Sequence, residues 1–142
     1  IGGKTDIVMM LNGALAGLVA ITAEPLTPGP ITAMFIGSIG AIIMYFGTKM
    51  LESYGLDDVV GAIPVHMFAG IFGTLVVPLT NPDTSFGTQF IGTASVCIFS
   101  FGLSWLTFTA LKSTIGLRIS KAAEKLGTDK AEVGVTAYSI RD

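Results

Sequence analysis

Apolar residues gather into four long runs along this chain, and polar residues gather between the runs. A helix needs about 20 apolar residues to cross a bilayer whose hydrocarbon core is roughly 30 Å thick. The pattern therefore predicts an all-α, polytopic transmembrane helix bundle over residues 1–114, followed by a polar tail over residues 115–142. The four helices are expected at approximately 5–23, 31–51, 58–79 and 86–112.

Composition agrees with a membrane protein. The 142 residues are 51% hydrophobic and only 13% charged, whereas a soluble domain carries about 25% charged residues. The net charge of −2 and the lack of a basic patch with interleaved aromatic residues argue against a nucleic-acid partner. The single Cys97 permits no disulfide and no cysteine-based metal site within one chain. We expect no metal, no cofactor and no enzymatic activity. Ile1 is not an initiator methionine, so we expect the chain to be part of something longer.

Several polar residues and glycines indicate where the helices begin and end. Asparagine, aspartate, serine and threonine cap helix N-termini, and glycine adopts the left-handed conformation that ends many helices. The expected assignments are Thr5 or Asp6 as the first cap, Gly55 as the stop of the second helix, Asp57 or Asp58 as the third cap, and a short tail helix from Ser120 through Leu126 to Gly127.

Small residues mark the faces on which helices are expected to touch. Gly13 and Gly17 form a GxxxG pair in the first helix, and Gly37, Gly40 and Ala41 give the second helix a small face. Within a membrane, small residues let helix backbones approach closely. We therefore expect close contacts at both places.

Basic residues indicate the orientation. All eight Lys and Arg residues fall before the first run, at the turn near 49–58, or after the fourth run. The only charged residues in the remaining two loops are Glu24 and Asp83. Because cytoplasmic loops are enriched in Lys and Arg, both chain ends and the middle turn are predicted to be cytoplasmic.

The third run carries the only histidine of the sequence, His66. An ionisable residue deep in a membrane is costly and by default indicates a pathway or relay. A structural histidine that bonds a neighbouring helix is the alternative. Helical spacing groups His66 with small and apolar residues and predicts that this face points into protein; the group is Ala62, Ile63, Ala69, Gly70 and Gly73. Pro64 lacks an N–H, so we expect a bend there and a Val60 carbonyl without its usual partner.

Three stretches of the chain carry a common pattern: residues 12–22 (NGALAGLVAIT), 57–66 (DDVVGAIPVH), and 116–120 (GLRIS) leading to Ala137-Tyr138. Together they resemble the ammonium transporter family, the Amt/Mep/Rh superfamily. Their order and spacing cover essentially the whole chain. The chain departs from the family's pattern at Gly61, where members often carry Asp, and at Pro64, where they often carry Gly.

The resemblance implies an eleven-helix protomer in a homotrimer of the cell membrane, of which this chain holds the last four helices and the cytoplasmic tail. His66 falls on the second histidine of the family's pore pair, past which ammonia moves after ammonium has lost its proton. Ala62, Ile63 and Met67 are then expected to form pore wall, and Asp57, Asp58 and Pro64 the start of the pore helix.

The resemblance also implies a role for the tail. Arg118, Gly127 and Tyr138 are its candidate regulatory residues, and a PII-type signalling protein is a candidate partner at the cytoplasmic face. Two other functions stay open from the sequence. One is an ammonium sensor that signals through its tail, and the other is a helical scaffold with a structural histidine.

Overall fold

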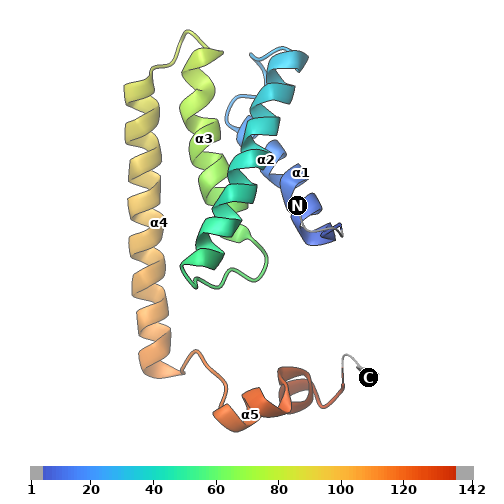
Figure 1. The fold of residues 1–142 in the computed structure, drawn as a ribbon. Coiled ribbons are helices and arrows are strands. Elements are labelled where there is room, and N and C mark those ends of the chain that lie inside the picture. Colours follow the sequence, from blue (N-terminus) through green and yellow to red (C-terminus); the bar gives the residue numbers. More distant parts are fainter. Residues whose placement is uncertain (1–4, 137–142) are drawn as a thin grey trace. The chain divides into compact units, whose positions relative to one another are not determined.

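The computed structural model describes residues 5–136, and every regular element within them is helical (Figure 1). This confirms the all-α prediction. The α-helices are α1 (Ile7–Thr22), α2 (Pro30–Ser53), α3 (Ala69–Val76), α4 (Phe86–Thr114) and α5 (Lys121–Leu126). Two π-helical segments (Ile63–Phe68 and Asp129–Val133) and a 3-10 turn (Val77–Leu79) complete the described chain. Helices α2 and α4 are long and apolar enough to cross a membrane, while α1 and the segment 63–79 are shorter apolar helices.

The helix ends follow local chemistry. The Asp6 carboxylate accepts a hydrogen bond from the Met9 N–H at 3.0 Å, so Asp6 is the cap of α1. After the C-terminal end of α2, Gly55 has φ +68°, and the Leu56 N–H donates to the Leu51 carbonyl at 3.0 Å. This left-handed glycine stop satisfies carbonyls that the helix leaves without partners. The predicted roles of Asp6 and Gly55 are confirmed.

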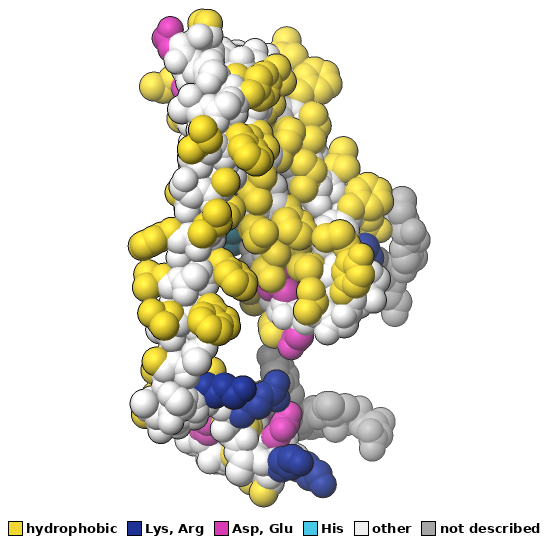
Figure 2. Space-filling model, turned by 90° about the vertical axis from the view of Figure 1, so that its left-hand side faces the viewer, with side chains coloured by type: hydrophobic (Ala, Val, Ile, Leu, Met, Phe, Trp, Pro, Cys, Tyr) yellow, Lys and Arg dark blue, Asp and Glu magenta, His cyan; other side chains and the backbone are white. Residues whose placement is uncertain are grey.

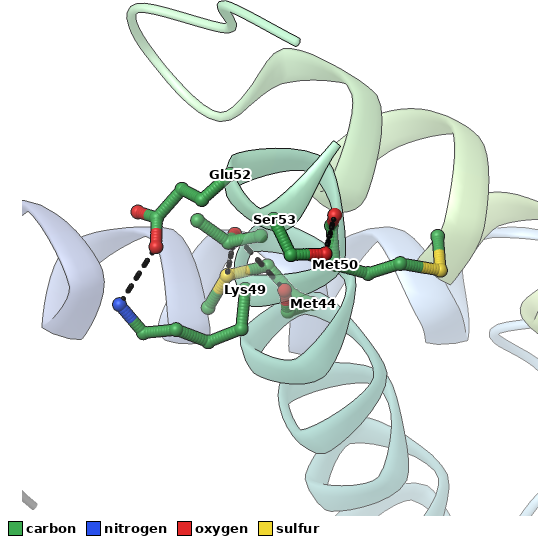
Figure 3. Close-up of polar contacts among 6 residues, drawn as sticks. Met44, Lys49, Met50, Glu52 and Ser53 are labelled. Carbon is green, nitrogen blue, oxygen red and sulfur yellow. Dashed lines mark hydrogen bonds and ion pairs between the residues drawn. The ribbon is translucent and has the colours of Figure 1, made fainter. Parts of the chain in front are cut away.

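Polar side chains near the end of α2 are satisfied within their own helix (Figure 3). The Ser53 hydroxyl donates to the Met50 carbonyl at 2.7 Å, and Lys49 pairs with Glu52 at 2.9 Å. Both charged side chains of that pair are about half exposed, and exposed pairs contribute about 0–1 kcal/mol. These residues finish the helix without tying it to a neighbour.

Helices α1, α2 and α3 lie side by side (Figure 1), and glycines set how closely they pack. A Cβ added to Gly17 would lie 3.1 Å from the Gly37 carbonyl oxygen, so the two backbones meet directly. A Cβ on Gly40 would lie 2.6 Å from the Ala20 Cβ. The close contacts predicted at Gly17, Gly37 and Gly40 are confirmed.

A small core lies where the three helices meet. It consists of Ala16, Met44, Val65 and Ala69, all at most 2% exposed. Because lipid is as apolar as these side chains, this core is held by close packing rather than by escape from water. The segment that carries His66 is thereby fastened to both α1 and α2.

Residues 98–142 form a separate compact unit, described as far as residue 136. Its short helix α5 has the predicted ends: the Ser120 hydroxyl accepts from the Ala123 N–H at 3.2 Å, and Gly127 follows with φ +98°. Figure 2 shows basic side chains gathered in this part of the chain on the face drawn. Up to residue 136, the exposed basic residues of the unit are Lys112, Arg118, Lys121, Lys125 and Lys130.

Candidate functional site

A capped turn starts the helical segment that carries His66. Both carboxylate oxygens of Asp58 accept backbone hydrogen bonds, from the Ala62 N–H at 2.9 Å and from the Ile63 N–H at 2.8 Å. The Gly61 N–H closes the turn by donating to the Asp58 carbonyl at 3.1 Å. Of the two carboxylates expected to serve as cap, Asp58 does so, while Asp57 is exposed.

This turn corrects the expected helix boundary. The first helical bond runs from the Val65 N–H to the Gly61 carbonyl at 3.1 Å, so the helix starts after Gly61 and not at residue 58. Pro64 therefore stands in the first turn, where an N–H has no intrahelical partner to begin with. The prediction that Pro64 deprives a helical carbonyl of its donor was wrong, because the Val60 carbonyl lies outside the helix.

The Val60 carbonyl instead accepts a hydrogen bond from a side chain of another helix. The Asn12 amide of α1 donates to it at 2.9 Å. Sequence reasoning noted no role for Asn12. The signal was available, because a polar amide within an apolar run needs a partner. What could not be read from the sequence is which carbonyl, 48 residues away, provides it.

His66 lies in a π-helical segment, Ile63–Phe68. The Ala69 N–H donates to the Pro64 carbonyl, five residues earlier, as well as to the His66 carbonyl. Such segments are rare and are frequently found at functional sites. A π-turn also changes which side chains share a face, so the predicted α-helical grouping fails on the C-terminal side of His66, toward Ala69 and Gly73.

The segment has a packed side and an open side. Pro64, Val65, Ala69 and Gly73 are buried, whereas Ala62, Ile63, His66 and Met67 are exposed. The structure thus separates His66 from Ala69 and Gly73, with which the α-helical spacing had grouped it. Within residues 5–136 the imidazole makes no hydrogen bond, so both ring nitrogens are available.

Phe68, the last residue of the π-helical segment, is partly buried. The structure places it against α2, where a Cβ added to Gly47 would lie 2.5 Å from the Phe68 ring. Gly47 therefore provides the space for this ring. The phenylalanine contributes to fastening the segment rather than to an outer surface.

Comparison with known proteins identifies the chain's relatives. The sequence model of the Ammonium Transporter Family matches residues 1–138. The chain belongs to the ammonium transporter family. It is 38% identical to the ammonium transporter Amt2 of Archaeoglobus fulgidus, over 96% of this chain and 33% of that protein. A putative ammonium transporter of Synechocystis is also 38% identical, over 87% of the chain and 25% of its own length.

A further relative, the ammonium transporter Amt2 of Methanocaldococcus jannaschii, is 33% identical over 97% of this chain and 35% of its own length. The chain thus spans a quarter to about a third of the curated relatives it matches. Its apolar helices and its family together identify it as part of a multi-pass membrane protein.

The tail residues suggested by the family resemblance lie apart from the histidine segment in the sequence. Arg118 is exposed, and Gly127 ends α5 in a conformation that favours glycine. Both belong to the unit at 98–142. Tyr138 lies outside the described residues.

Proposed function

We propose that the whole protein moves ammonium across the membrane and that His66 is one member of a pore histidine pair. Two facts support this function: the family to which the chain belongs, and relatives that are named ammonium transporters. The observation that carries the assignment to His66 is the open side of its π-helical segment.

The open side has the chemistry that a dry pore requires. His66 is surrounded along the segment by Ala62, Ile63 and Met67, which offer no charge and no strong hydrogen-bonding group. A bare ammonium ion loses its hydration shell in such a place at high cost. Parting ammonium from its proton removes that cost, because neutral ammonia needs far less solvation.

Imidazole suits this task because each ring nitrogen can donate or accept a hydrogen bond. We propose that His66 bonds ammonia and helps to relay the proton, while the three apolar neighbours form pore wall. The chain spans only about a third of its relatives' length, so the opposite wall and the partner histidine are proposed to come from the rest of the protein.

The test is transport by the whole protein in proteoliposomes. His66→Ala is expected to fold and assemble, yet net proton-coupled ammonium flux should fall by roughly 100-fold or lose its selectivity against other cations, since the reacting group is gone. Ammonium-dependent current and internal pH are the measurements. Unchanged flux, coupling and selectivity would contradict the role of His66. Wild-type protein that binds ammonium but carries no flux would favour the sensor function instead.

We further propose four membrane crossings with both chain ends and the middle turn in the cytoplasm. The support is the one-sided distribution of the basic residues. With Cys97 replaced, cysteines near Thr27 and Thr84 should react with membrane-impermeant thiol reagents from outside. Cysteines at Ser53 and Ser120 should react only from the cytoplasm, and external labelling at Ser53 would overturn this orientation.

A homotrimer and a cytoplasmic contact with a PII-type protein complete the proposal. Arg118, Gly127 and Tyr138 are the candidate tail residues, and the defined ends of α5 support an ordered tail segment. Native mass spectrometry of the whole protein, with and without the residues after Gly116, measures both. The tail has no such role if its removal changes neither the trimer nor binding of the partner.

A further inference from the structure

We infer that Asn12 is a positioning residue for His66, because its amide anchors the turn from which the histidine segment starts. This inference rests on the proposed function of His66. The anchor is the 2.9 Å hydrogen bond from the Asn12 amide to the Val60 carbonyl. It joins α1 to the turn directly before the helical segment.

The Val60 carbonyl accepts this side-chain bond in place of a helical one. Gly61 has φ +73°, which turns the chain away from helical geometry, and the helix uses the Gly61 carbonyl as its first acceptor. The Val60 carbonyl is thereby left outside the helical ladder. The Asn12 amide provides the side-chain donor for this carbonyl, at 2.9 Å.

Gly61 is shaped to admit this amide. A Cβ at position 61 would lie 2.6 Å from the Asn12 amide nitrogen, closer than real side chains approach. The positive φ likewise disfavours any other residue. Gly61 therefore serves both the left-handed turn and the close approach of the amide.

The anchor matters because the residues that follow it form a π-helical turn instead of a regular α-helix. His66 lies five residues after Gly61, within the π-helical segment. The Asp58 cap fixes the first two N–H groups from within the turn itself. Among residues 5–136, only Asn12 connects the turn to another helix through a side-chain hydrogen bond. Without Asn12, the turn can shift relative to α1, and His66 shifts with it.

A hydrogen bond beyond the C-terminal end of α3 offers a matched control. There the Asn81 amide donates to the Glu24 carboxylate at 2.8 Å, joining residues 57 apart in sequence. Both bonds come from an asparagine amide, and both connect distant parts of the same unit. Only the bond of Asn12 lies at the start of the histidine segment.

The experiment compares Asn12→Leu with Asn81→Leu in the whole protein, with His66→Ala in parallel. For Asn12→Leu we expect ammonium flux in proteoliposomes to fall by about tenfold or more, since small misplacements of a reacting group are costly. Hydrogen exchange should accelerate at the amides of Ala62, Ile63 and Val65 while global thermal stability matches that of Asn81→Leu. Asn81→Leu should keep the flux and the slow exchange at these three amides.

Wild-type flux and exchange in Asn12→Leu would overturn the inference, as would an equal loss of flux in both asparagine variants. If Asn12→Leu does not fold, Asn12→Asp preserves the shape and replaces the donor with a carboxylate oxygen, and the same criteria apply to it. Wild-type flux in His66→Ala would instead overturn the proposed function, while the exchange at Ala62 and Ile63 still decides whether Asn12 anchors the turn.

Discussion

The two sides of the helical stretch from Ala62 to Val76 differ in burial. On one side, Val65 and Ala69 are at most 2% exposed and belong to the core shared with α1 and α2. On the other side, His66 and Met67 are exposed, although His66 directly follows the buried Val65 in the sequence. One short stretch of chain thus carries both the fastening of the bundle and the proposed site.

This difference separates the residues that pack the bundle from His66, the residue of the proposed site. The packed side is composed of small and apolar residues that fit tightly against two helices. The open side carries the residues of the proposed site. We therefore expect substitutions on the packed side to change stability and substitutions on the open side to change transport.

The largest effect is expected on the packed side, at Gly73. A Cβ there would collide with the carbonyl oxygen of Ala20, a backbone atom that cannot move aside without shifting α1. Gly73→Val should lower stability by about 3 kcal/mol or prevent folding, the upper range for overpacking. Detergent-solubilised yield and thermal unfolding measure this.

Gly70→Ala is the matched control for that substitution. A Cβ at Gly70 would lie 3.7 Å from the Val19 Cγ1, an ordinary contact. It should change stability by less than about 1 kcal/mol. If Gly73→Val were as stable as Gly70→Ala, the close packing of this side against α1 would be refuted.

The smallest effect is expected on the open side, at Met67. Its side chain is 49% exposed, so Met67→Ala should change stability by no more than about 0.5 kcal/mol. As proposed pore wall, the variant should alter the relative flux of ammonium and the larger methylammonium ion by a few-fold. Two-substrate flux measurements with equal amounts of folded protein test this, and an unchanged ratio would remove Met67 from the wall.

Features set by local chemistry could be predicted from the sequence. The caps at Asp6 and Ser120 and the glycine stops at Gly55 and Gly127 depend on neighbouring residues only, and the structure has them where expected. Close contacts at Gly17 and at Gly37 were also expected, because small residues let membrane helices approach closely. The structure shows that these two glycines meet each other.

Features set by tertiary packing could not be predicted. The π-helical turn places His66 on a different side from Ala69 and Gly73. No short-range sequence pattern predicts such a turn. The start of the helix after Gly61 depends on a positive φ and on an amide that arrives from α1. For the site, Ala62, Ile63 and Met67 lie exposed beside His66. Their role as pore wall stays a prediction.

The central claim is that fold and function occupy opposite sides of one segment, and adjacent residues on those sides test it most directly. Val65→Ala and His66→Ala are compared in the whole protein by thermal unfolding and by ammonium flux per folded protein. Val65→Ala should lose about 1–3 kcal/mol of stability through a packing defect and keep its flux. His66→Ala should keep its stability and lose its flux. Loss of flux in Val65→Ala with stability intact, or loss of stability in His66→Ala with flux intact, would contradict the account.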